Sequence, residues 1–348
     1  MNNKLDIFCT LGPSTLNKKF LKFAKGKVSL LRLNMSHVSL NELKKNINFV
    51  KKNTNTPICV DTEGAQIRTK VLKKKNLKIN EQFKFFKQKN ANHLYPYDVY
   101  DKLKIHDYLS IGFDDLVAKI ISKNLKFITL KVTSAGKLED NKGVHVINRL
   151  IKLNFLTEKD LHAIEIAKKM NIQNFALSFT NNVEDIDRFK KILPTQTKIY
   201  KIESKHAVKT FNKLIKIGDN FLIDRGDLSK EMSIENIPYI QRKILKKSKE
   251  FKNKKIYIAT NFLESMIINK FPTRGEANDI YSSLEMGARG IVLAAETAIG
   301  NYPKESIIFL KKMMFAYKKN LNWLIKNLYH SSQLGHISTS KKIKNKVF

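Results

Sequence analysis

Eight short apolar runs typical of β-strands alternate with helical patterns along this chain of 348 residues. Such alternation favours βα units, because two parallel strands need a long crossover connection, usually a helix. Eight strands close a barrel, so we predict an α/β fold of the (β/α)8 TIM-barrel type. The predicted strands are residues 5–11, 28–34, 57–61, 173–178, 198–203, 220–223, 255–260 and 290–294.

Helix starts are marked by three pairs in which a serine or threonine is followed three residues later by an acidic residue. In such a capping box each side chain accepts from the backbone N–H of the other residue, which satisfies donors that the first helical turn leaves free. The pairs are Ser39 with Glu42, Thr157 with Asp160, and Thr273 with Glu276.

The alternation breaks between the third and fourth strands. There the pattern predicts short β segments at residues 83–87, 108–112, 116–121 and 127–135. We therefore predict a small all-β domain inserted after strand 3. Insertions of this kind lie on the βα loops of the catalytic face and can close as lids. The expected domains are a barrel from residues 1–69 and 149–330, a lid at 70–148, and a basic tail at 331–348.

Composition excludes several classes of protein. No apolar run is long enough for a membrane helix, and the N-terminus shows no secretory signal. The two cysteines, Cys9 and Cys59, lie in apolar runs, which indicates buried thiols in the cytoplasm rather than a disulfide framework or a zinc site.

The chain has 65 Lys+Arg against 31 Asp+Glu, a formal charge of +34. One interpretation of this excess is attraction of anions. The other is a lysine-rich composition, which is favoured because the lysines are scattered over every predicted helix.

Polar residues gather at the ends of seven of the eight predicted strands. The carboxyl ends of parallel barrel strands meet on one face, where barrel enzymes carry their active sites. The sequence therefore predicts an active site at that face. The polar ends are Thr10–Ser14, Arg32–His37, Asp61–Gly64, Lys201–Glu203, Asp224–Asp227, Thr260–Asn261 and Glu296–Thr297.

Lys201 and Glu203 are two residues apart, so on a strand they face the same side. Two buried opposite charges are costly unless they are paired or used. One interpretation is a structural ion pair. In the other interpretation, Lys201 binds phosphoryl oxygens and Glu203 binds a divalent metal. Asp227 on the next loop would supply a second carboxylate ligand. Mg²⁺ favours one or two carboxylates together with water and substrate oxygens. Gly226 permits close approach of the backbone to a ligand.

Eight short motifs follow one another along the chain. They are Cys-Thr-Leu-Gly-Pro-Ser, Arg-Leu-Asn-Met-Ser-His, Asp-Thr-Glu-Gly, Lys-Ile-Glu, Arg-Gly-Asp-Leu, Ala-Thr-Asn-Phe-Leu-Glu-Ser-Met, Pro-Thr-Arg-Gly-Glu and Glu-Thr-Ala. No single motif is decisive, but the order is specific. From residue 5 to about residue 310 this ordered set resembles the pyruvate kinase family.

The resemblance implies a role for each matching residue. Lys201 would stabilise the transferring phosphoryl group, and Thr260 would bind the substrate carboxylate and relay a proton through a water. The implied ligands are Arg32 for the substrate phosphate; Gly226, Asp227 and Thr260 for the carboxylate; Glu203 and Asp227 for Mg²⁺ or Mn²⁺; Asn34, Ser36, Asp61 and Thr62 for K⁺; and Asn34, His37, Arg68 and Lys142 for the nucleotide.

Some positions depart from the family pattern. Gln66 is neutral where many members carry glutamate and some carry lysine, and that position bears on the need for K⁺. Asp224 adds a negative charge where the family has a small apolar residue. The family usually continues into a C-terminal domain with effector sites, and we expect a short form without it.

The leading hypothesis is a pyruvate kinase of glycolysis that binds phosphoenolpyruvate and ADP. A second is a diverged barrel enzyme that acts on a related enolpyruvyl or 2-oxo acid substrate. A third is a kinase-like protein that binds nucleic acid or a partner and catalyses little, which the presence of Lys201, Glu203 and Asp227 disfavours. We expect no membrane and no nucleic acid as partners, and assembly into a homo-oligomer stays open.

Overall fold

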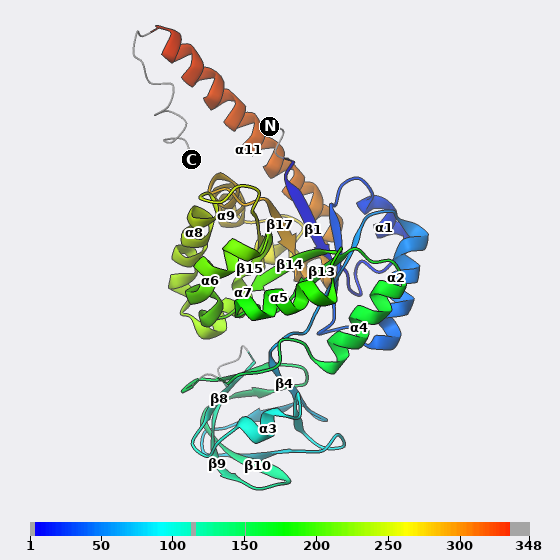
Figure 1. Ribbon diagram of the computed structural model, residues 1–348, viewed down its shortest axis with the longest axis vertical. Coiled ribbons are helices and arrows are strands. Elements are labelled where there is room, and N and C mark those ends of the chain that lie inside the picture. Colours follow the sequence, from blue (N-terminus) through cyan, green and yellow to red (C-terminus); the bar gives the residue numbers. More distant parts are fainter. Residues whose placement is uncertain (1–3, 113–115, 150, 335–348) are drawn as a thin grey trace. The chain divides into compact units, whose positions relative to one another are not determined.

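A closed barrel of eight parallel strands forms the centre of the first unit of the protein (Figure 1). The computed structural model describes residues 4–112, 116–149 and 151–334. Around the barrel the strands follow the order β1, β17, β16, β15, β14, β13, β3 and β2, which confirms the predicted fold. Their bounds are β1 Asp6–Thr10, β2 Leu30–Asn34, β3 Ile58–Asp61, β13 Asn174–Leu177, β14 Thr197–Ile202, β15 Asn220–Asp224, β16 Lys255–Ala259 and β17 Gly290–Leu293.

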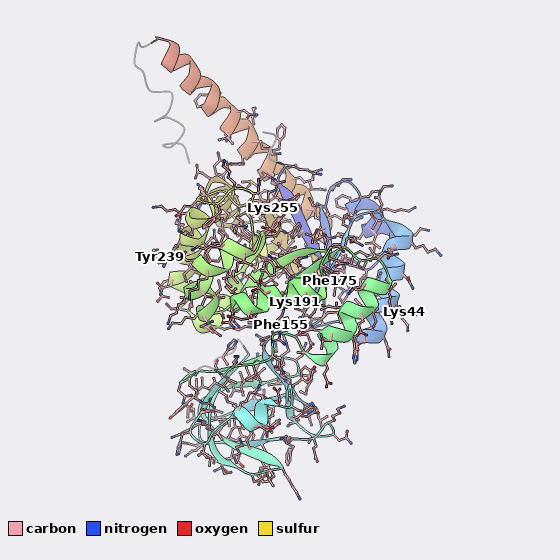
Figure 2. All side chains as sticks on the ribbon, viewed as in Figure 1. Lys44, Phe155, Phe175, Lys191, Tyr239 and Lys255 are labelled. Carbon is pink, nitrogen blue, oxygen red and sulfur yellow. The ribbon has the colours of Figure 1, made fainter. Side chains whose placement is uncertain are left out.

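Helices surround the barrel (Figure 1). Charged and polar side chains such as Lys44 on α2 and Tyr239 on α8 point outward, whereas Phe175 on β13 is fully buried (Figure 2). The helical elements that lie wholly or mostly in this unit are α1 Lys18–Ala24, α2 Leu40–Asn53, α4 Glu158–Lys169, α5 Val183–Ile192, α6 Lys205–Ile217, α7 Arg225–Glu231, η1 Ile234–Asn236, α8 Ile237–Ser248, η2 Glu264–Ile267, α9 Arg274–Glu285, α10 Ala295–Ala298 and α11 Pro303–Leu334.

The three predicted capping pairs begin helices in the structure. Ser39 with Glu42 caps α2, and Thr273 with Glu276 caps α9, each as a full capping box. Before α4, Thr157 Oγ1 accepts from Asp160 N at 3.1 Å and Asp160 Oδ2 accepts from Thr157 N at 3.0 Å.

Apolar side chains fill the interior of the barrel, contributed by all eight strands. At the junction of β1 and β17 the space is too small for any side chain, because a Cβ on Gly290 would lie 2.3 Å from the carbonyl oxygen of Asp6. The barrel therefore closes only around a glycine at this position. The interior residues are Phe8, Leu30, Cys59, Ala176, Ile199, Leu222, Tyr257, Ala259 and Val292.

The second unit is mainly β-structure with its own apolar core, which includes Phe85, Leu109 and Ile128. Seven strands form one sheet in the order β6, β10, β9, β8, β12, β4 and β7, and β11 pairs with β5. The elements are β4 Ile67–Lys70, β5 Lys75–Leu77, β6 Gln82–Phe86, β7 His93–Tyr95, α3 Val99–Lys102, β8 Tyr108–Ile111, β9 Leu116–Lys123, β10 Phe127–Ser134, β11 Gly136–Leu138 and β12 Gly143–Val146.

The contacts within the chain assign Glu63–Leu161 and Ser229–Ser233 to this second unit. The insert expected from sequence, residues 70–148, is shorter. One cause of the wider limits is Asp160, whose carboxylate accepts from the backbone N–H of Glu63 at 2.7 Å and of Gly64 at 3.0 Å. The assignment of the units as catalytic and lid domains stays a prediction.

Three further expectations concern the tail, the membrane and the cysteines. Helix α11 continues to Leu334, so residues 331–334 are helical, and the remainder of the expected tail, 335–348, lies outside the described residues. No helix in the described part of the chain is long and apolar enough to span a membrane. Cys9 and Cys59 are buried free thiols, as predicted.

Candidate active site

Lys201 lies at the centre of a buried network of charges at the carboxyl ends of the strands. It occupies the end of β14, and its side chain is 5% exposed. Its Nζ lies 2.8 Å from Glu203 Oε1, 3.2 Å from Asp61 Oδ2 and 3.9 Å from Asp224 Oδ2. Residues 201 and 203 do meet on one side of the strand, as their spacing predicted.

A second buried cation, Arg32 in the middle of β2, shares one of these acidic partners, Asp61. Its Nη1 donates to Asp61 Oδ2 at 2.7 Å, and its Nε donates to Thr10 Oγ1 at 3.0 Å. Asp61 thus holds both Arg32 and Lys201, which positions two positive side chains at neighbouring points of the barrel mouth.

Ser178 belongs to this network although sequence reasoning gave it no role. Its Oγ lies 3.1 Å from Lys201 Nζ and 2.7 Å from the carbonyl oxygen of Thr62, to which it donates. It comes directly after β13, the one predicted strand whose polar end was not counted among the site residues. Its place at a strand end was the signal that could have identified it.

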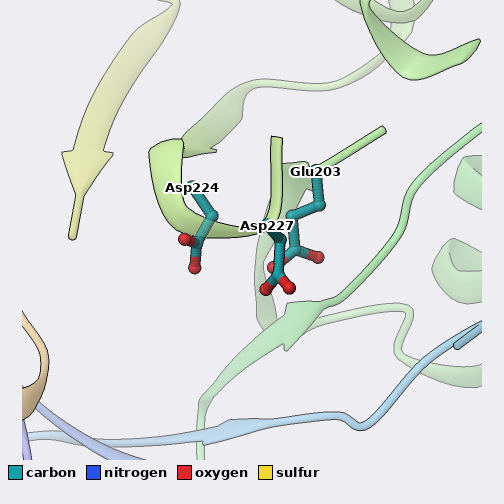
Figure 3. A group of neighbouring side chains, drawn as sticks. All are labelled: Glu203, Asp224 and Asp227. Atoms are coloured by element: carbon teal, nitrogen blue, oxygen red, sulfur yellow. The ribbon is translucent and has the colours of Figure 1, made fainter. Parts of the chain in front are cut away.

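Three carboxylates converge beside Lys201: Glu203, Asp224 and Asp227 (Figure 3). One oxygen from each lies within 4.8 Å of the others. Glu203 is fully buried; its Oε2 accepts from Phe179 N at 2.6 Å, and its Oε1 accepts no hydrogen bond among the described residues although Lys201 Nζ is near. Hard carboxylate oxygens in this arrangement fit a divalent cation such as Mg²⁺ or Mn²⁺.

The sequence places Asp224 among the polar residues just after the sixth predicted strand and as a departure from the family pattern, and it assigns this residue no ligand. The structure makes it the last residue of β15, which is why it points to the same place as Glu203. It is 8% exposed, and its Oδ1 accepts the hydroxyl proton of Thr260 at 2.6 Å.

Thr260 follows β16 in a strained backbone conformation, with φ +79°. Arg225 helps to hold it, because its Nη2 donates to the Thr260 carbonyl oxygen at 2.6 Å while its Nη1 pairs with Asp279 at 2.6 Å. A Cβ on Gly226 would lie 2.8 Å from Thr260 Cγ2. Gly226 is therefore required for the close packing of α7 against this residue.

Opposed charges set the protonation of the network. Burial by itself lowers the pKa of Lys201, but Asp61 and Glu203 more than offset it, so the pKa is raised and the ammonium stays charged. Burial raises the pKa of Glu203, and Asp227 and Asp224 raise it further against the opposing effect of Lys201. The neighbouring carboxylates thus favour protonation of Glu203, and a bound cation would oppose this by favouring the charged form.

The residues predicted to bind K⁺ come from the ends of β2 and β3. Asp61 and Thr62 are buried and joined through Ser178, whose Oγ contacts Asp61 Oδ1 at 3.3 Å. Asn34 Oδ1 accepts from Ser36 N at 3.0 Å, which folds this turn back on itself. These contacts bring the four residues to adjacent strand ends, and their binding of K⁺ stays a prediction.

The predicted nucleotide contacts fall in both units. Asn34 is the last residue of β2, and the exposed His37 lies on the turn that follows, where His37 N donates to Asn34 O at 3.0 Å. Arg68 on β4 lies opposite Gly143 on β12, beside Lys142. Lys142 Nζ is 2.9 Å from Glu139 Oε2. Within the second unit these two cations are therefore near neighbours.

Comparison with known proteins identifies the family. The family model for the pyruvate kinase barrel domain matches residues 2–307. The pyruvate kinase of Methanocaldococcus jannaschii is 34% identical over 90% of this chain and 69% of that protein. The enzyme of Thermotoga maritima is 31% identical over 94% and 74%, and that of Clostridium perfringens is 31% identical over 93% and 73%. With its barrel and the ordered polar strand ends, this chain belongs to the pyruvate kinase family.

Proposed function

We propose that this chain transfers the phosphoryl group of phosphoenolpyruvate to ADP and produces pyruvate and ATP. The observation that carries the proposal is the Lys201 ammonium, buried beside three carboxylates at the mouth of a barrel of this family. In the reaction the bond between phosphorus and the enol oxygen breaks, and a bond to the terminal phosphate oxygen of ADP forms. The enolate that remains takes up a proton at carbon to give pyruvate.

Each residue would act by position and charge, as phosphoryl transfer requires. Lys201 and Arg32 would face the oxygens of the transferring group, and Asp61 keeps both side chains in place. The backbone at Gly226 and Asp227 would receive the substrate carboxylate. Glu203 and Asp227 would hold Mg²⁺ or Mn²⁺, which supplies charge neutralisation on the phosphate and carboxylate.

The remaining assignments are also part of this proposal. Asn34, Ser36, Asp61 and Thr62 would bind K⁺, and Asn34, His37, Arg68 and Lys142 would contact the nucleotide. The buried thiols of Cys9 and Cys59 support a reducing cytoplasm as the site of action.

A coupled assay tests the function directly. Purified protein receives phosphoenolpyruvate, ADP, MgCl₂ and KCl, and pyruvate is detected with lactate dehydrogenase and NADH. We expect pyruvate formation that requires both substrates and the protein. The matched control is a Lys201→Met preparation purified in the same way, which must lack this activity. Absence of pyruvate with folded wild-type protein would refute the proposal.

A specific observation favours a second candidate, a diverged enzyme that acts on a related enolpyruvyl or 2-oxo acid. The Thr260 hydroxyl donates its proton to Asp224, so in this arrangement it does not offer that proton to a substrate carboxylate. Product analysis with a panel of 2-oxo acids and enolpyruvyl compounds separates the two candidates.

A further inference from the structure

The candidate site contains more carboxylates than cations. Among its described residues, Lys201 and Arg32 face Asp61, Glu203 and Asp224, and Asp227 lies beside the last two. Asp61 and Glu203 pair closely with the two cations. Asp224 does not, because its Oδ2 is 3.9 Å from Lys201 Nζ, the longest of the three contacts that this ammonium makes with carboxylates. The charge of Asp224 is thus the least compensated of the three that contact Lys201.

Asp224 also determines where the Thr260 hydroxyl points. The 2.6 Å hydrogen bond to Oδ1 uses the only proton of that hydroxyl, so its lone pairs, and not a donor, face any other ligand. A carboxylate of a substrate accepts hydrogen bonds and needs a donor. Asp224 therefore weakens the binding of an anionic ligand in two ways. Its negative charge repels the ligand, and its hydrogen bond removes the Thr260 hydroxyl as a donor.

For a divalent cation the effect of Asp224 has the opposite sign. One of its oxygens lies within 4.8 Å of oxygens of Glu203 and Asp227, so a cation held by those two also meets a third negative charge. Each added carboxylate strengthens cation binding, since charge count sets the affinity of oxygen sites.

We propose that Asp224 is a specificity-determining residue that strengthens binding of the divalent cation and weakens binding of the anionic substrate. This inference rests on the proposed function, which supplies both ligands. If Asp224 has this role, the affinity of the chain for phosphoenolpyruvate depends on a side chain that need not touch the reacting atoms.

The test compares two ligand affinities in the variants Asp224→Asn and Asp224→Ala. Asparagine keeps the volume and an oxygen that accepts from Thr260, and it removes only the charge. Isothermal titration calorimetry measures binding of Mn²⁺ to the substrate-free protein, and binding of phosphoenolpyruvate at saturating Mg²⁺ without ADP.

We expect opposite shifts in Asp224→Asn: Mn²⁺ binds about tenfold more weakly and phosphoenolpyruvate about tenfold more tightly, as expected when one unit charge is removed a few ångströms away in a partly buried site. Asp224→Ala should tighten phosphoenolpyruvate further, because the Thr260 hydroxyl is then available as a donor. General damage to the site would weaken both ligands together.

Asp219→Asn is the matched control. Asp219 directly precedes the same strand at its opposite end, and its side chain is 72% exposed and paired with Lys254. Both affinities should stay at the wild-type values. Circular dichroism verifies that all variants are folded, and if Asp224→Ala is not, Asp224→Asn alone decides.

The outcomes separate this inference from the proposed function. Unchanged or weakened phosphoenolpyruvate binding in folded Asp224→Asn overturns the role of Asp224. Failure of the wild-type protein to bind phosphoenolpyruvate with Mg²⁺ overturns the proposed function instead.

Discussion

Lys201 Nζ lies 3.2 Å from Asp61 Oδ2 although strand β13 separates the two strands that carry these residues. The same carboxylate oxygen accepts from Arg32 at 2.7 Å. One buried aspartate thus fixes two cations that come from different parts of the sequence.

Lys201→Met should abolish phosphoryl transfer, with a loss of at least about 10²–10³-fold in kcat, because it removes a positioned charge that meets the transition state. The coupled assay measures it. Lys198→Met is the control, since Lys198 lies on the same strand and its Nζ donates to carbonyl oxygens of Leu193 and Gln196. Turnover near the wild-type value in Lys201→Met would show that this lysine is not catalytic.

Glu203→Gln and Asp227→Asn should each raise the Mg²⁺ concentration that gives half-maximal activity by about tenfold or more, because each removes a charged oxygen from the carboxylate group. The measurement is activity titrated against MgCl₂ at constant ionic strength. Asp219→Asn should leave the half-saturation unchanged. If neither site variant shifts it, the divalent cation binds elsewhere.

KCl should raise activity above that in tetramethylammonium chloride at equal ionic strength. Asp61 and Thr62 bring buried oxygens together, and Gln66 carries no charge that could replace the ion. Equal ionic strength is essential because salt screens the binding of anionic substrates. Equal rates in the two salts would exclude a functional K⁺ site, and Gln66→Glu should then create a K⁺ requirement.

Asp107→Asn should destabilise the second unit by roughly 1–3 kcal/mol at pH 7. Burial raises the pKa of Asp107, but hydrogen bonds from Arg149 and from Lys104 N outweigh this and hold its pKa below the usual range. A folded-state pKa below the unfolded one stabilises the fold above about pH 4, and this contribution is lost as the pH falls through the folded-state value.

Calorimetric unfolding from pH 7 to pH 3 measures this difference, and the gap in stability between wild type and Asp107→Asn should narrow toward the acidic end. Asp98→Asn is the control, because Asp98 pairs with Lys102 at a partly exposed position within one helical turn and should change stability by less than about 0.5 kcal/mol. A constant difference across the pH range would contradict the role of the Asp107 charge.

Gly290→Ala should destabilise the barrel by roughly 2–4 kcal/mol, because its Cβ would lie 2.3 Å from the Asp6 carbonyl oxygen and force β1 and β17 apart. Gly275→Ala is the matched control. In α9 a Cβ there meets only Thr273 Oγ1 at 3.8 Å, so the variant should be neutral or slightly stabilising. Denaturant unfolding measures both, and equal stability of Gly290→Ala and wild type would be inconsistent with this packing.

The barrel and its polar strand ends could be predicted because they are local. Short apolar runs, capping pairs such as Ser39 with Glu42, and the spacing of Lys201 and Glu203 each depend on the periodicity of a helix or strand. The second unit was predicted less completely, since β4, β5, β7, β11 and β12 are only three or four residues long and are formed by pairing with distant strands.

The sequence by itself determined the order of the barrel strands and the family, and it named most of the residues that meet at the candidate site. Tertiary structure alone decided which of them meet. Ser178 joins Lys201 to Thr62, Arg32 shares Asp61 with Lys201, and Asp224 takes the proton of Thr260. These partners are 23 to 140 residues apart in the chain, so only closure of the barrel, which brings all strand ends to one face, sets their distances.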